Sequence, residues 1–173
     1  MFIPSHRHPT RWATRAILAV GALTVVVACG DSDEGGDGEV VLDPETVTLE
    51  YRFNDASVPP EFHRSYTLMA EAASAHLVVD SYGDVLHDVT EPVDEELWQS
   101  VLDAAATMSN VTGDTSDGCA GGTSEELRVF DGDDEALIDV SVDHCGSSSG
   151  PDLAEAVGGV LALFDLETLL APS

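Results

Sequence analysis

Alternating hydrophobic and polar positions mark the clearest strand of this chain, at residues 46–53. Every second residue from Val47 to Phe53 is apolar, which predicts a strand with one buried face. Similar patterns predict five more strands, at residues 65–71, 76–82, 85–89, 125–130 and 136–142. The alanines in residues 65–76 also favour a single helix there, as the alternative to the second and third strands.

Helical spacing begins after Asp94, which is a suitable N-cap and is followed by two acids that favour the start of a helix. The apolar residues at helical spacing are Leu97, Trp98, Val101, Leu102 and Ala105. They predict an amphipathic helix of about 14 residues.

A second helix is expected from Gly150–Pro151, with proline in its first turn. Gly158–Gly159 inside it would cost about 1 kcal/mol per glycine. Close packing of this helix on the sheet would explain that cost. A short final turn is expected at residues 165–170.

The predicted order is therefore β-β-β-β-α-β-β-α. Strands grouped before helices are typical of the α+β class, in which helices cover one face of an antiparallel sheet. The predicted domain spans residues 45–173, which is long enough for one hydrophobic core.

A different pattern precedes this domain. Three arginines lead into an apolar run of 13 residues, Ala16–Ala28, which ends at Cys29. The run is shorter than the roughly 20 residues of a spanning helix and has the layout of a secretory signal peptide. Its last four residues, Val26-Val27-Ala28-Cys29, resemble the lipobox of bacterial lipoproteins.

The lipobox resemblance implies removal of residues 1–28, lipidation of Cys29, and attachment to the extracytoplasmic side of the cell membrane. Residues 29–44 would form an acidic, self-repelling linker between the lipid and the domain. Val26 departs from the usual lipobox, which has leucine there. An ordinary secreted protein cleaved at another position is the alternative.

Charge restricts the possible partners. From Cys29 onward there are three basic residues, Arg52, Arg64 and Arg128, against 33 acidic residues, a formal net charge of −30. There is no lysine. Such a chain repels nucleic acid and anionic lipid head groups, so nucleic-acid binding is not expected and lipid must provide the membrane attachment.

Three cysteines leave an even pair once Cys29 is assigned to lipid. Outside the cytoplasm, Cys119 and Cys145 are expected to form a disulfide that clamps the open end of the hairpin formed by the last two predicted strands. A catalytic thiol at Cys145 with His144 as base is the alternative. Neighbouring residues on a strand point to opposite faces, which argues against it.

The segment Ser57–Tyr66 is the candidate binding site. It contains Pro59–Pro60 and presents Phe62, His63, Arg64 and Tyr66. Stiff prolines reduce the entropy lost on binding, and arginine and aromatic residues are enriched at binding hot spots. The alternative is a structural crossover in which Arg64 pairs with acids and Phe62 packs inward.

Other candidate chemistry is weaker. The histidines at 63, 76, 87 and 144 lack the spacing of a zinc site, and the acids at 131–135 fail the calcium-loop template, so no metal or other cofactor is expected. The glycines after Cys119 lead into a strand and lack a P-loop lysine. No Gly-x-Ser-x-Gly motif occurs, and no catalytic residue is assigned.

The segments Ser57–Tyr66, Ser81–Val85 and Cys119–Ser124 together resemble an uncharacterised domain of bacterial exported proteins. That resemblance covers roughly residues 45–130 and implies no activity. The sequence therefore favours a lipid-anchored domain that binds a protein or another envelope ligand. An extracytoplasmic hydrolase and a purely structural envelope component are the alternatives.

Overall fold

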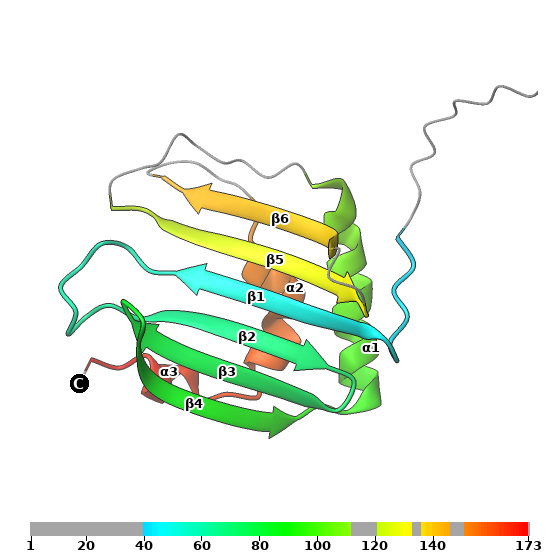
Figure 1. Cartoon of the computed structure of the whole chain (residues 1–173), viewed down its shortest axis with the longest axis horizontal. Coiled ribbons are helices and arrows are strands. Elements are labelled where there is room, and N and C mark those ends of the chain that lie inside the picture. Colours follow the sequence, from blue (N-terminus) through cyan, green and yellow to red (C-terminus); the bar gives the residue numbers. More distant parts are fainter. Residues whose placement is uncertain (1–39, 112–120, 133–135, 146–150, 173) are drawn as a thin grey trace, which may run out of the picture. The chain divides into compact units, whose positions relative to one another are not determined.

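The computed structural model describes residues 40–111, 121–132, 136–145 and 151–172, all within one compact unit of residues 37–173. Six strands form one sheet (Figure 1). Their bounds are Val47–Asn54 for β1, Ser65–Glu71 for β2, Ser74–Ser81 for β3, Asp84–Pro92 for β4, Thr123–Asp131 for β5 and Ala136–His144 for β6.

All neighbouring strands in the sheet are antiparallel, in the order β4-β3-β2-β1-β5-β6. The strands β1 to β4 form a meander, and β5 returns to pair with the free side of β1. The first strand therefore lies inside the sheet, and β4 and β6 are its edges.

Within the described residues, four helical segments accompany the sheet. They are α1 (Glu95–Ala106), the 3₁₀ turn η1 (Thr107–Asn110), α2 (Leu153–Leu161) and the short α3 (Leu166–Leu169). Asp94 caps α1 as predicted, because its Oδ1 accepts a hydrogen bond from the Leu97 N–H at 2.8 Å. The indole N–H of Trp98 donates to the carbonyl of Pro44 at 3.0 Å, which ties the start of the domain to α1.

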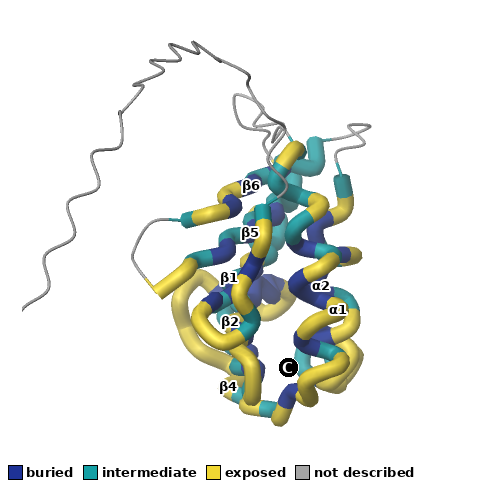
Figure 2. The backbone as a smooth tube through the Cα atoms, turned by 90° about the vertical axis from the view of Figure 1, so that its right-hand side faces the viewer, coloured by how far each residue is buried: buried dark blue, intermediate teal, exposed yellow. Residues whose placement is uncertain are grey.

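The helices lie on one face of the sheet, and buried segments of sheet and helices face each other (Figures 1 and 2). On β1, Val47, Leu49 and Tyr51 are buried and Arg52 is exposed, as the alternation predicts. The α+β class, the single antiparallel sheet and the one-sided helix layer are thus confirmed.

Residues 65–76 form two strands, as predicted, and not the alternative single helix. Three details of the sequence prediction are wrong. The predicted order β-β-β-β-α-β-β-α lacks η1 after α1 and counts residues 165–170 as a turn, whereas they contain α3. Pro151 precedes α2, which begins at Leu153 after the N-cap Asp152. A Cβ on Gly159 would lie 2.8 Å from Cδ1 of Leu97, so this glycine permits close packing against α1 and not against the sheet.

The predicted disulfide partner Cys119 lies outside the described residues, as do parts of the loops at residues 109–124 and 131–135. Cys145 follows the end of β6 and is half-buried. The Cys119–Cys145 bridge stays a prediction.

Candidate functional site

The segment that connects β1 and β2 is organised by Asp55. Its Oδ1 accepts the N–H of Ala56 at 2.7 Å, and its Oδ2 accepts the N–H of Arg64 at 2.9 Å. The Asp55 N–H donates to the hydroxyl of Ser65 at 3.0 Å. These bonds join the two ends of the segment, so the proline-rich stretch between them is held at both sides.

The turn between β3 and β4 packs on this segment. The Tyr82 hydroxyl donates to the carbonyl of Val58 at 2.6 Å, and the Ser81 hydroxyl donates to the carbonyl of Pro60 at 2.8 Å. The rings of His63 and Tyr82 stack with centroids 3.8 Å apart. Two segments that are distant in sequence therefore form one rigid end of the domain.

Tyr82 has a positive φ of 53° and is followed by Gly83 at 92°. Two-residue hairpin turns of this kind favour Asn-Gly, and a tyrosine in the left-handed region is uncommon. Its hydroxyl bond to Val58 and its stacking on His63 offset that conformational cost. The sequence prediction placed Tyr82 in a strand, because nothing local to Tyr82 indicates these contacts.

The four predicted binding residues do not share one surface. Phe62 is 56% exposed, whereas His63, Arg64 and Tyr66 are buried. The guanidinium of Arg64 donates to the carbonyl of His63 at 2.7 Å, and to the carbonyl of Ala171 at 3.1 and 3.3 Å. Arg64 thus holds the C-terminal segment against the domain and is not presented to a partner.

The structural alternative is also corrected in part, because Phe62 does not pack inward. Phe62 lies next to His63, which stacks on Tyr82, and Tyr82 is itself 56% exposed. Val85 and Leu86 follow on β4 and are exposed as well. We use the name apolar end patch for the four exposed residues Phe62, Tyr82, Val85 and Leu86, which lie on the β1–β2 connection and on the β3–β4 hairpin that packs against it. Half of the eight large hydrophobic residues that are exposed among the described ones belong to it.

Next to the apolar end patch, the imidazole Nε2 of His63 lies 3.4 Å from the hydroxyl of Ser65. This spacing is that of a weak hydrogen bond between a base and a nucleophile. Both residues are buried, and the Ser65 hydroxyl already accepts the N–H of Asp55. The pair therefore stabilises the loop and does not present a nucleophile to a substrate.

A buried carboxylate that the sequence analysis missed lies under the other half of the sheet. Glu125 of β5 accepts hydrogen bonds from the N–H groups of Leu153 and Ala154 at 2.8 and 3.2 Å. Its other oxygen lies 3.3 Å from Nε2 of His144. Because Asp152 makes no side-chain capping bond, Glu125 provides the acceptor for the start of α2.

Burial raises the pKa of the Tyr51 hydroxyl strongly, and the nearby Tyr66 and Glu125 raise it further. Burial also raises the pKa of Tyr66. Both phenols are therefore neutral at physiological pH. Tyr51 and Tyr66 form a polar cluster with Glu125 within the core. One carboxylate oxygen of Glu125 accepts both hydrogen bonds that hold the start of α2.

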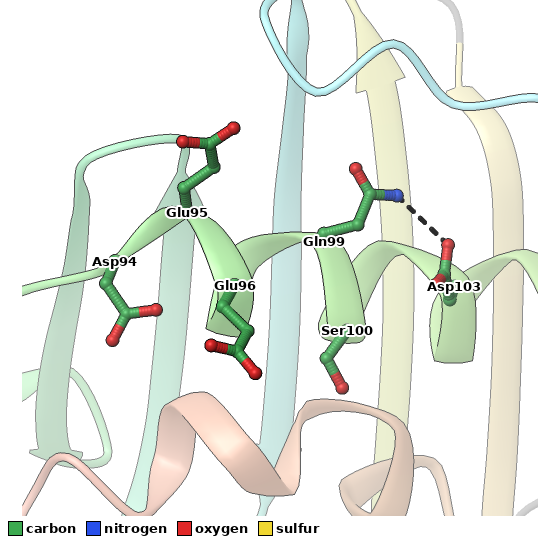
Figure 3. A pocket seen from close by; sticks show the side chains of 6 residues that line it. All are labelled: Asp94, Glu95, Glu96, Gln99, Ser100 and Asp103. Carbon is green, nitrogen blue, oxygen red and sulfur yellow. Dashed lines mark hydrogen bonds between the residues drawn. The ribbon is translucent and has the colours of Figure 1, made fainter.

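The outer side of α1 has a shallow depression of about 800 Å³ lined only by polar residues (Figure 3). The lining residues are Asp94, Glu95, Glu96, Gln99, Ser100 and Asp103. Within the part of the chain that the structure describes, no three metal-ligating side chains come close enough to hold an ion. The depression is an acidic, solvated surface. Nε2 of His76 lies 2.7 Å from Oδ1 of Asp88.

No protein-family profile matches this chain, and none of the curated proteins compared with it is significantly similar. Among residues 40–111, 121–132, 136–145 and 151–172, no helix is long and apolar enough to cross a membrane.

Proposed function

We propose that this protein is a lipid-anchored, extracytoplasmic interaction module whose partner contacts the apolar end patch. The observation that carries the proposal is the exposure of Phe62 and Tyr82 on a rigid end of a strongly acidic domain. Aromatic side chains on a preorganised surface lose little entropy when they bind. The patch contains half of the large hydrophobic residues that are exposed among the described ones, so a partner that covers it removes apolar area from water.

The anchoring part of the proposal rests on the sequence. Residues 1–28 would direct export, Cys29 would carry the lipid, and the Cys119–Cys145 disulfide would form in the oxidising compartment outside the cytoplasm. Replacing Cys29 by alanine tests it. We expect loss of fatty-acid incorporation and accumulation of the unprocessed chain. Fatty acid that still labels the variant contradicts the lipid anchor.

Binding is tested with a photo-crosslinking amino acid at position 62 in intact cells. Position 69 is the matched control, because Met69 is also an exposed hydrophobic residue but points to the open face of the sheet. We expect a discrete adduct from position 62 and none from position 69. Equal adducts at both positions, or none at either, contradict a specific contact at the apolar end patch.

A further inference from the structure

The edge strand β4 is unusually accessible. None of its nine residues is buried, whereas the opposite edge β6 has three buried residues. β4 pairs only with β3, and none of the other described strands pairs with its outer side. An edge strand leaves a row of N–H and C=O groups that another extended chain can use.

Only part of β4 is regular enough for such pairing. The register shifts near Val79, so that Val79 pairs with His87 and Asp80 with Val85, which leaves Leu86 as an extra residue. A bulge bends and twists its strand and interrupts continuous pairing. The segment of β4 that can pair with a further strand is therefore His87–Glu91, directly after the apolar end patch.

The two faces of this segment differ in chemistry. Val89 pairs with the fully buried Leu77 and is itself half-buried against the core, so it lies on the helix side. Asp88 pairs with Val78 and lies on the open side, where it is exposed and contacts His76. A strand beside β4 would place one side chain next to Val89 and its neighbour next to Asp88.

The charge of β4 indicates which kind of chain can pair with it. The strand carries Asp84, Asp88 and Glu91 and no arginine or lysine. Two copies of β4 would bring these acids together, within chains that each have a large negative charge, so self-pairing is disfavoured. The same acids attract a cationic chain.

We propose that β4 takes up an extended, cationic segment of a partner protein as a seventh strand, with a basic residue beside Asp88 and an apolar residue beside Val89. Main-chain hydrogen bonds would supply much of the affinity, and the alternating side chains would supply specificity. The inference rests on the proposed binding function, since it specifies the partner chemistry next to the apolar end patch.

The test uses the purified, full-length protein in detergent and an acetylated, amidated peptide of four Val-Lys repeats. We expect slower amide hydrogen exchange in residues 87–91 and no change in β6. The same peptide N-methylated on every residue is the matched control, because it keeps the charge and the side chains but has no main-chain N–H on either edge. It should lose binding.

Charge reversal provides a second, independent measurement. Asp88→Lys should weaken binding of the Val-Lys peptide about five-fold. Asp139→Lys is the matched control, because Asp139 is also an exposed acid on an edge strand and lies 3.6 Å from Arg128. We expect less than a two-fold effect there. A Val-Glu peptide should not bind.

Several results would overturn the inference. Equal weakening by both reversals, or equal binding of the parent and the N-methylated peptide, would show unspecific attraction between a polyanion and a polycation. Dimers that protect residues 87–91 without peptide would identify a second copy as the occupant. A peptide that protects β4 while position 62 gives no adduct would support the edge site and contradict only the contact at the apolar end patch.

Discussion

Arg64→Ala separates a structural from a binding role for this arginine. Arg64 is 6% exposed, and its guanidinium makes three hydrogen bonds to two main-chain carbonyls, those of His63 and Ala171. A hydrogen bond to a charged group contributes about 1.5–3 kcal/mol. The two bonds to Ala171 share one acceptor at an exposed chain end, so we count them as about 1 kcal/mol.

We therefore expect Arg64→Ala to lower the free energy of unfolding by about 2–4 kcal/mol, since truncation also removes the packing of the side-chain stem. Urea unfolding at fixed pH and salt measures this as a lower midpoint with an unchanged slope. Arg52→Ala is the matched control. It removes the same charge from an exposed position and should change stability by less than about 0.5 kcal/mol.

Truncation after Leu170 divides the effect between the two acceptors. If Arg64 acts partly through Ala171, the truncated chain should lose about 1 kcal/mol, and Arg64→Ala should cost correspondingly less in that background. Arg64→Lys should recover less than half of the loss, because an ammonium group cannot reach two acceptors in the geometry of a guanidinium. An Arg64→Ala chain as stable as Arg52→Ala would refute the reasoning and return Arg64 to the candidate binding residues.

Four further predictions concern the core, the charge and the cysteines. Glu125→Ala should lower the free energy of unfolding by about 3 kcal/mol, and Glu125→Gln by about half as much, because glutamine keeps an oxygen acceptor for the start of α2. If urea unfolding shows the same loss of free energy for both variants, capping by this oxygen is contradicted. Folding raises the pKa of Tyr51 and Tyr66 above the usual 10.0, so the unfolded chain loses its phenolic protons at lower pH than the folded chain does. The free energy of unfolding is therefore fully retained below about pH 10 and falls as the pH rises above it. Tyr51→Phe should make that fall less steep in alkaline melting curves. The melting temperature should rise from low to about 1 M salt, where the Debye length is about 3 Å and the acids no longer repel one another; a constant value would show that they are too widely spaced to interact. The delipidated protein should show no reactive thiol when denatured without reductant, whereas two titratable groups would exclude the Cys119–Cys145 bridge.

Local sequence determined most of the secondary structure. An alternation such as that from Val47 to Phe53 buries one face of any sheet it joins, and an N-cap such as Asp94 satisfies helix N–H groups only three residues away. Both signals act over a few residues, so they can be recognised in the sequence without knowledge of the fold. The alternation along β5 also marks one buried carboxylate. Glu125 precedes Leu127 and Val129 at the buried spacing, which places a carboxylate on the core side of β5.

The tertiary structure alone decided the candidate site. Residues 55–64 have no periodicity, so no local rule directs the side chain of Arg64 inward or that of Phe62 outward. The carbonyl that Arg64 contacts belongs to Ala171, 107 positions along the chain. The exposure of β4 likewise depends on β5 pairing with β1 and not with β4. Which edge stays open is a property of long-range pairing, and a pattern with a period of two residues carries no information about it.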